Sequence, residues 1–429
     1  MKDVKYIAFD APLYDYHTIE EKLTRLAAEG WHPEKVGTLF WKFRRGEPKQ
    51  VRYAITYAPS ASTFNSRPTD AEEDLADLCA QAGWVRVGTQ AQRHVYRNED
   101  PDATPLDTDE GERLKNIRWT MIKHFFPSEL LLVLLFVLQF FTHWNTMTRS
   151  PAWVLSSPMM VTTMSMLLFV AVIHVVMMVS GWMWLRRAKI AADSGEELPR
   201  DRFYCWFRWV VWGSLLGYLL CLLWTVSLGF AAWVILTSAL ILTVTAGGLT
   251  LCKRWNAPKW VNIVVPAGLC ILILALLMPL MVLSIVHSDA TLPADDLPLT
   301  LTQLTGETGT EREILQEDCS FLCSYARYWD RGEEDAHLSY TIIDVKCPLV
   351  YDRLLNEQEE QLLMAANYAV YPGISEKAAL FDADYVRNAR NNTGDRWLIC
   401  WDSRIVFLRA SWNLTEEQIS VIAEQLRPN

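Results

Sequence analysis

Five apolar runs between residues 125 and 286 constrain this chain more than any other feature. A bilayer core about 30 Å thick is crossed by a helix of roughly 20 mainly apolar residues. Soluble helices usually carry a polar face, and these runs do not. The sequence therefore predicts a multi-domain membrane protein built around a five-helix transmembrane bundle. The expected spans are residues 128–147, 161–185, 209–227, 230–252 and 261–286.

The third and fourth spans come from one long apolar stretch, because no charged residue lies between Trp209 and Cys252. A single helix of that length would extend about 66 Å at 1.5 Å per residue, which is too long for one crossing. We therefore expect two spans joined by a tight turn at Ser227–Gly229. In the last run, Pro266 and Pro279 are expected to kink the helix.

Basic residues flank the runs unevenly, and such residues mark the cytoplasmic side of a membrane protein. Four precede the first span, six lie between the second and third, and three lie between the fourth and fifth, whereas the other side has Arg149 alone. We therefore expect a cytoplasmic N-terminus and an extracytoplasmic C-terminus. The opening residues MKDVKYIAFD contain no apolar leader, so the first span is expected to direct insertion.

The charge differs between the three parts of the chain. Residues 1–124 have a net charge of −2, residues 125–286 of +5 and residues 287–429 of −13. A strongly acidic outer part disfavours binding to polyanions, and no direct nucleic-acid binding is expected.

The N-terminal residues 1–98 contain an internal repeat in which a helix ends at Gly-Trp and strands follow. Helices are expected over residues 17–29 and from residue 70, and strands over residues 4–9, 39–43, 51–57, 85–87 and 94–96. The repeated positions are Gly30, Trp31 and Phe43 in the first copy and Gly83, Trp84 and Tyr96 in the second. This pattern predicts a cytoplasmic α+β domain, a small antiparallel sheet with two helices on one face. The tryptophans are expected in its core rather than at ligand-stacking sites.

The pattern AAEGWHPEK…FWKFRR…VRYAITY, followed by AQAGWVRV…HVYRNE, resembles the bacterial family of domain of unknown function 2812 (DUF2812), in its multi-span membrane subgroup. The resemblance covers roughly residues 1–110. It implies a bacterial plasma-membrane protein with a regulatory role. Its implied partners are the lipid bilayer and a cytoplasmic protein such as a PadR-like regulator. The family supplies no catalytic residues.

Residues 99–124 are expected to form a linker and a juxtamembrane helix, and residues 287–310 a spacer. Residues 311–429 are expected to form an extracytoplasmic α+β domain of the order ββα…ββα. Its helices are expected over residues 311–318 and 348–368, with a last helix capped by Thr415. Two hairpins, at residues 321–345 and 397–410, are the expected ligand or partner surface.

Four cysteines of the outer part lie where a disulfide can persist, namely Cys319, Cys323, Cys347 and Cys400. Four cysteines allow three pairings, and the sequence leaves these open beside the alternative of buried free thiols.

No nucleotide-binding, metalloprotease or hydrolase motif is present, so no catalytic, cofactor-binding or metal-binding residues are expected. His174 and Gln139 are the polar residues within spans that we single out as functional candidates. The alternative for His174 is helix packing or an interhelical hydrogen bond.

These features favour a non-enzymatic signalling or regulatory protein that couples an outer sensing domain to an inner partner-binding domain. A transport accessory or small permease component is the alternative. A membrane enzyme using carboxylates such as Asp382 and Asp384 is a third hypothesis, without a motif to support it.

Overall fold

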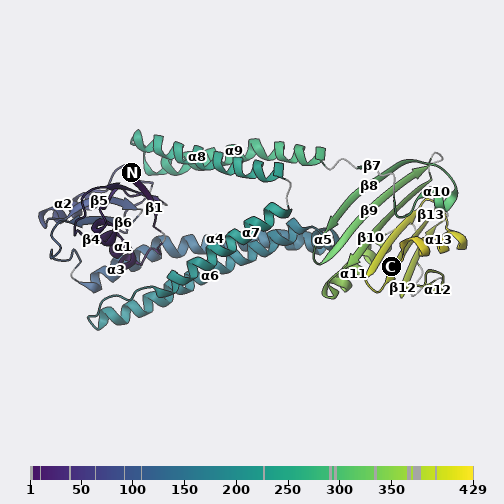
Figure 1. The fold of residues 1–429 in the computed structure, drawn as a ribbon, viewed down its shortest axis with the longest axis horizontal. Helices are drawn as coiled ribbons and strands as arrows, with labels where there is room; N and C mark the ends of the chain where they lie inside the picture. The colour runs from purple at the N-terminus through teal and green to yellow at the C-terminus, as the bar shows by residue number, and fades with distance from the viewer. Residues whose placement is uncertain are drawn as a thin grey trace. The chain divides into compact units, whose positions relative to one another are not determined.

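The computed structural model contains two compact units (Figure 1). It describes residues 3–428 except residues 10, 38–39, 63, 91, 108, 226–227, 289–291, 294–296, 333–335, 365–368, 371–377 and 392–393. The first unit comprises Met1–Val137, Leu168–Leu223 and Ser227–Pro279, and the second comprises Leu138–Leu167, Trp224–Val226 and Leu280–Asn429. The chain thus has an N-terminal α+β region, apolar helices and a C-terminal β-rich domain.

The N-terminal region consists of two βαββ copies, so the repeat is longer than the predicted one. The first copy is β1 (Val4–Ala8), α1 (Tyr16–Ala28), β2 (Trp31–Lys35) and β3 (Phe40–Arg45), and the second is β4 (Arg52–Tyr57), α2 (Asp70–Gln81), β5 (Val85–Gln90) and β6 (Arg93–Asn98). Each copy forms its own antiparallel sheet, in the orders β1-β3-β2 and β4-β6-β5. Both helices end at a glycine with a left-handed backbone, Gly30 (φ 82°) and Gly83 (φ 81°).

The single small sheet expected from the sequence is therefore wrong. Strand β3 is the central strand of its sheet, with β1 and β2 paired on its two sides, so the following strand β4 cannot be added beside it. After β3 the Gly46 N–H donates to the Gly30 carbonyl (2.9 Å) and the Lys49 N–H donates to the Ala27 carbonyl (3.1 Å), which holds the connection at the end of α1. Strand β4 pairs instead with β6, in a separate sheet.

The core of the N-terminal region continues into the following helices. Helix α1 packs its buried residues, Ile19 and Leu23 among them, against β2 and β4. The same core includes Ile117 of α3 (Glu110–Thr120), Met121 and Phe125 of the π-helix η1 (Met121–Phe125), and Trp184 of α6 (Pro158–Asp193). The N-terminal region and part of the helical segment therefore share one core.

Helices cover all five predicted apolar runs. They are α4 (Phe126–Arg149), α6, α7 (Arg202–Thr225), α8 (Leu228–Arg254) and α9 (Lys259–Ser288). In the described part of the chain, four helical stretches are long and apolar enough to cross a membrane: Glu110–Arg149, Pro158–Asp193, Ile235–Arg254 and Lys259–Leu277. These four are consistent with a multi-pass membrane protein. The predicted turn at Ser227–Gly229 begins within residues 226–227, which lie outside the described residues.

The C-terminal domain is built on an eight-stranded sheet in the order β11-β12-β13-β14-β10-β9-β8-β7 (Figure 1). Its strands are β7 (Leu292–Pro293), β8 (Gly309–Cys319), β9 (Cys323–Gly332), β10 (His337–Val345), β11 (Ala369–Val370), β12 (Tyr385–Asn391), β13 (Gly394–Trp401) and β14 (Arg404–Ala410). Its helical segments are α10 (Leu301–Thr305), η2 (Pro348–Val350), α11 (Tyr351–Leu363), α12 (Ala378–Phe381) and α13 (Glu416–Leu426). Helix α5 (Pro151–Ser156), between α4 and α6, also belongs to this unit.

Two predicted helices of this domain differ from the structure. The helix expected over residues 311–318 is wrong, because these residues form β8 and pair with β9 along almost their full length. Glu, Arg, Leu and Gln favour helices only weakly, and strand pairing overrides that preference here. The helix expected over residues 348–368 is shorter, with its α-helical part at Tyr351–Leu363, and residues 365–368 lie outside the described residues. The predicted cap at Thr415 is confirmed, since its side chain accepts from the Gln418 N–H.

Gly181 allows α6 to pass directly beside the π-helix. A Cβ atom at this position would lie 2.9 Å from Cε1 of Phe125 and 3.1 Å from Cε of Met121. Both contacts are closer than carbon atoms normally approach, so a larger residue requires the Phe125 and Met121 side chains, or α6 itself, to shift.

We expect Gly181→Leu to lower the stability of the full-length protein by about 1–3 kcal/mol, the usual cost of overpacking a core. Thermal unfolding of the purified protein in detergent measures the change. Gly217→Leu in α7 is the matched control, because no described atom lies within 4 Å of a Cβ at that glycine. Equal melting temperatures for the two variants would contradict the close packing.

Candidate functional site

A buried junction joins the N-terminal region to the connection between α6 and α7. The Tyr14 hydroxyl donates to Oδ2 of Asp201 (2.8 Å), and the two residues are 0% and 1% exposed. The Tyr14 ring packs on Trp184 with 4.8 Å between centroids, and Nε1 of Trp184 donates to the Pro199 carbonyl (2.7 Å). Burial raises the pKa of Tyr14 well above its usual value, so the hydroxyl remains the donor.

Helix α1 makes two further contacts with the same connection. A ring nitrogen of His17, Nε2, lies 3.1 Å from the Leu198 carbonyl, and Arg200 forms an ion pair of 2.6 Å with Glu21. Burial lowers the pKa of His17, which favours the neutral imidazole at pH 7. A neutral ring with its proton on Nε2 donates to the Leu198 carbonyl, so this contact does not need a charge.

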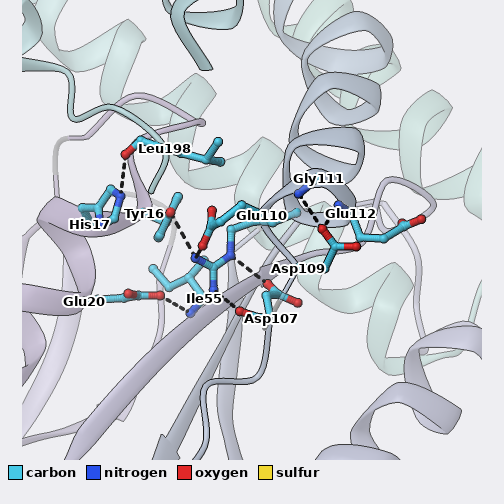
Figure 2. Close-up of polar contacts among 11 residues, drawn as sticks. Tyr16, His17, Glu20, Ile55, Asp107, Asp109, Glu110, Gly111, Glu112 and Leu198 are labelled. Atoms are coloured by element: carbon cyan, nitrogen blue, oxygen red, sulfur yellow. Dashed lines mark hydrogen bonds and ion pairs between the residues drawn. The ribbon is translucent and has the colours of Figure 1, made fainter. Parts of the chain in front are cut away.

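Arg113 of α3 organises a second polar cluster at the start of α1, with Tyr16, Asp107 and Glu110 as its partners. Figure 2 shows these three residues. Its Nη1 donates to the Tyr16 hydroxyl (3.0 Å) and to Oε1 of Glu110 (2.9 Å). Its Nε donates to Oδ2 of Asp107 (3.2 Å), and its Nη2 donates to the Asp107 carbonyl. Asp107 lies in the expected linker and Arg113 in the expected juxtamembrane helix, and together they fasten α3 to α1.

Glu20 of α1 connects the first repeat to the second sheet. Its Oε1 accepts the backbone N–H of Ile55 in β4 (2.7 Å). Figure 2 marks this hydrogen bond with a dashed line. The side chain is half-buried, and this burial raises the pKa of Glu20 to about 7. The hydrogen bond from the Ile55 N–H stabilises the charged carboxylate and lowers the pKa, but by less than burial raises it. A carboxyl group that titrates near neutrality therefore lies between α1 and β4.

The N-terminal region also contacts the turn between α8 and α9. Asn262 is completely buried, and its Nδ2 donates to the Phe64 carbonyl (2.7 Å) and to Oγ of Ser66 (2.8 Å). Ser66 in turn donates to the Ala257 carbonyl (2.6 Å). The loop before α2 is therefore held against this turn by side-chain hydrogen bonds.

The face of the first sheet that is exposed to solvent, its outer face, has aromatic and basic side chains. A shallow hollow of ≈ 760 Å³ is lined by Tyr6, Lys35, Gly37, Phe40 and Lys42. Tyr6 is 66% exposed and Phe40 61%, whereas Trp41 and Phe43 on the opposite face of β3 are buried. Exposed aromatic side chains are enriched at protein-binding surfaces, so Tyr6 and Phe40 mark this face as a candidate surface.

The C-terminal domain holds the connection between α4 and α6. The Glu357 Oε2 atom accepts the Ala152 N–H (2.8 Å), and Ser320 Oγ donates to the Leu155 carbonyl (2.5 Å). Arg353 donates to the carbonyl of Thr148 in the last turn of α4 (2.7 Å). Burial raises the pKa of Glu357 to about 7. Ala152 is itself part of the domain's hydrophobic core.

Of the two polar residues singled out within the spans, His174 has a carboxylate partner. Its Nδ1 lies 2.7 Å from Oε2 of Glu129 in α4, and its ring stacks on Phe136 with 5.8 Å between centroids. Gln139 is exposed on α4. The sequence does not predict the Glu129–His174 pair, because the two residues lie 45 positions apart and no motif links them.

The four C-terminal cysteines have different environments. Cys319 is exposed at the end of β8, Cys347 is half-buried, and Cys323 and Cys400 are buried. Burial raises the pKa of Cys323 to about 11 and that of Cys400 to about 12, so both thiols are poor nucleophiles. All four are free thiols in the structure, and pairing between them stays a prediction.

The repeated aromatic residues occupy two kinds of position. Trp84, Phe43 and Tyr96 are fully buried, and Nε1 of Trp84 donates to the Thr104 carbonyl (3.2 Å). Trp31 is only half-buried, and the cationic groups of Lys5 and Arg45 lie 5.5 and 5.8 Å from its ring centroid.

The described residues contain no group of three or more His, Cys, Asp or Glu side chains arranged to hold a metal ion. Of the carboxylates considered for an enzyme, Asp382 forms an ion pair of 2.6 Å with Arg427.

Residues 15–126 match the model of a family described as "Protein of unknown function (DUF2812)". No curated protein and no solved structure matches the chain. The matched segment extends past the second repeat through α3 and η1 to the first residue of α4. Residues of α3 and η1 belong to the N-terminal core, whereas Trp184, Ala188 and Leu198 of the same core lie outside the matched segment.

We expect Glu20→Gln to stabilise the protein at pH values above about 7 and to have little effect in acid. The folded chain raises the pKa of Glu20 from 4.5 to about 7 and so binds the proton more tightly than the unfolded chain. That contribution to stability is present below pH 4.5 and is lost as the pH rises through 7. At about 1.4 kcal/mol per unit, reduced by solvent access, the gain is on the order of 1–3 kcal/mol.

Thermal unfolding of the purified protein across this pH range measures the effect. Glu29→Gln is the control, since it removes an exposed carboxylate next to the same helix. The same pH profile for both variants would contradict a special role for Glu20.

Proposed function

We propose that this chain is a multi-pass regulatory protein of a bacterial plasma membrane and not an enzyme. In this proposal α4, α6, α7, α8 and α9 span the bilayer as a five-helix bundle. The N-terminal region lies in the cytoplasm, and residues 311–429 form an extracytoplasmic α+β domain. The uneven distribution of lysine and arginine around the apolar runs supports this orientation.

The attachment of both folded regions to α4 and α6 carries the proposal. Phe125, directly before α4, and Trp184 in α6 belong to the N-terminal core. Ala152, in the connection between α4 and α6, belongs to a core of the C-terminal domain. Closely packed side chains transmit a displacement of one helix to its neighbours, because a densely packed core has low compressibility. A change in the outer domain would therefore act on the N-terminal region through these two helices.

We infer that the N-terminal region binds a cytoplasmic protein with the outer face of its first sheet. The exposed Tyr6 and Phe40 provide apolar contact area. Lys35 favours a partner with acidic residues around an apolar centre, whereas Lys42 is already paired with Glu34 (2.8 Å). A PadR-like regulator, implied by the family resemblance, is one partner of this class.

Transport is the second candidate function, and the Glu129–His174 pair favours it. A path across the membrane usually needs a chain of polar groups in the helices. In the described helices this pair is the one ion pair between two of the apolar segments, and its stacking on Phe136 also suits a packing role. We therefore rank regulation above transport.

The proposed orientation predicts that Cys319 reacts with a membrane-impermeant maleimide on intact cells. Cys319 is exposed, whereas Cys323 and Cys400 of the same domain are buried. After mild reduction, we expect Cys319→Ser to remove most of the label, and Cys79→Ser to leave it unchanged because Cys79 is buried in the N-terminal region. Labelling that appears only after cell lysis would contradict an outer C-terminal domain.

The regulatory role predicts a protein contact at Phe40. We expect a photo-crosslinking amino acid in place of Phe40, in the full-length protein in its native cells, to capture a defined cytoplasmic protein. Leu78 of α2 is the control position, since it is 65% exposed on a helix that packs against β5 of the second sheet. The proposal fails if Phe40 yields no adduct or the same adducts as Leu78. Adding the lysine substitutions Lys35→Glu and Lys42→Glu should weaken the adduct at least severalfold.

A further inference from the structure

A groove runs between α3 and the last turns of α6. Its volume is ≈ 850 Å³, and its most exposed apolar residues are Trp119 (58%), Ile122 (48%) and Trp182 (48%). Both helices contribute residues three or four positions apart, which is the spacing of a single helix face. The groove lies entirely within the first unit.

The two helices are antiparallel along the groove, which orders its residues. Gly181 packs against Met121 and Phe125, and the earlier His174 of α6 contacts the later Glu129 of α4, so residues later in α6 lie beside residues earlier in the segment that contains α3. The end nearest the apolar run of α4 is therefore lined by Ile122, Phe126 and Trp182. The other end is lined by basic residues, namely Lys115, Arg118, Arg186 and Lys189, with Asp193 as the one lining acid.

These basic side chains are available to a ligand. The Arg186 guanidinium lies over the Trp182 ring, 3.6 Å from its centroid, and Lys115 forms an exposed pair with Glu112 (3.0 Å). Within the residues that the structure describes, no ion pair engages Arg118, Arg186 or Lys189. The groove therefore has an uncompensated positive charge beside an apolar end.

We propose that this groove binds the headgroup of an anionic phospholipid, with Arg118, Arg186 and Lys189 contacting its phosphate. This inference rests on the proposed membrane placement of α4 and α6. Basic residues just beyond a span attract anionic headgroups, and tryptophans concentrate at the same depth. The lipid acyl chains would continue along Leu130 and Leu131, which are 48% and 56% exposed on α4.

An anionic lipid fits this groove better than an acidic peptide. A peptide would leave the apolar end, formed by Ile122, Phe126 and Trp182, without a counterpart of matching chemistry. A phospholipid matches both ends at once, because its charged headgroup can lie at the basic end while its acyl chains lie at the apolar end. Lipid bound here would bridge α3 and α6, and so would stiffen the link between the N-terminal region and the helices.

Native mass spectrometry of the full-length protein in detergent tests the proposal. Phosphatidylglycerol is titrated against phosphatidylcholine as the zwitterionic reference. We expect retained phosphatidylglycerol adducts, and we expect Arg118→Gln with Arg186→Gln to weaken their binding by about tenfold or more. Lys123→Gln with Arg187→Gln is the matched control, because these residues carry the same charges on the same helical segments outside the groove lining. The control variant should bind as the wild type does.

Each other outcome is informative. Equal losses in both double variants would show general surface attraction and overturn the site, as would unchanged binding in the groove variant. If glycerophosphoglycerol, which has no acyl chains, or an acidic peptide displaces the lipid at equal concentration, the groove is an anion or peptide site instead. Circular dichroism confirms that the variants fold. Extraction of cell membranes with alkaline carbonate tests membrane integration separately, so failure of the groove and failure of the membrane proposal are distinguishable.

Discussion

The packing of Tyr14 against Trp184 and Asp201 determines how the N-terminal region is completed. Removing the Asp201 carboxylate from water is costly, and the Tyr14 hydroxyl offsets that cost from a position 187 residues away. The Tyr204 N–H, at the start of α7, supplies a second hydrogen bond. Because the partners come from both regions, the N-terminal fold and the α6–α7 connection stabilise each other.

This dependence bears on the segment that matches the DUF2812 model. Residues 15–126 contain both helices and all strands of the repeat except β1, but they do not contain Trp184, Ala188 or Leu198 of the shared core. A segment cut at residue 126 would expose the apolar surface that these residues cover. Apolar surface on such a fragment binds other proteins without specificity. Partner studies on the isolated region would therefore confuse this surface with a functional one, whereas the full chain keeps it buried.

Local features were predictable from the sequence, and long-range ones were not. The apolar runs located the helices because length and composition are sufficient for that inference. Gly30, Gly83 and Thr415 marked helix ends because their roles depend on neighbouring residues alone. The separation into two sheets depends instead on the strand order, which pairs β3 with both β1 and β2 and leaves no place beside it for β4. The pattern of apolar residues along the sequence does not reveal this order.

The candidate site was missed for the same reason. Tyr14, Asp201, Glu20 and Arg113 appear in the sequence as ordinary polar residues in loops and amphipathic helices. Their long-range partners lie 35 to 187 residues away, and burial rather than any motif raises the pKa of Tyr14 and Glu20. The strand β8 was missed because its pairing with β9 outweighs its helix-forming composition.

The π-helix shows how one local irregularity serves both the shared core and the groove. Ile117, Met121 and Phe125 are each four residues apart and all buried. In a regular α-helix of 3.6 residues per turn, positions four apart drift steadily around the axis. The wider turn of η1, closed by a bond from the Phe126 N–H to the Met121 carbonyl, reduces that drift and keeps Met121 and Phe125 facing Gly181. Trp119 and Ile122 then face the groove from the adjoining side of the same segment. The extra residue in this turn therefore lets one short segment pack against α6 and line an open surface together.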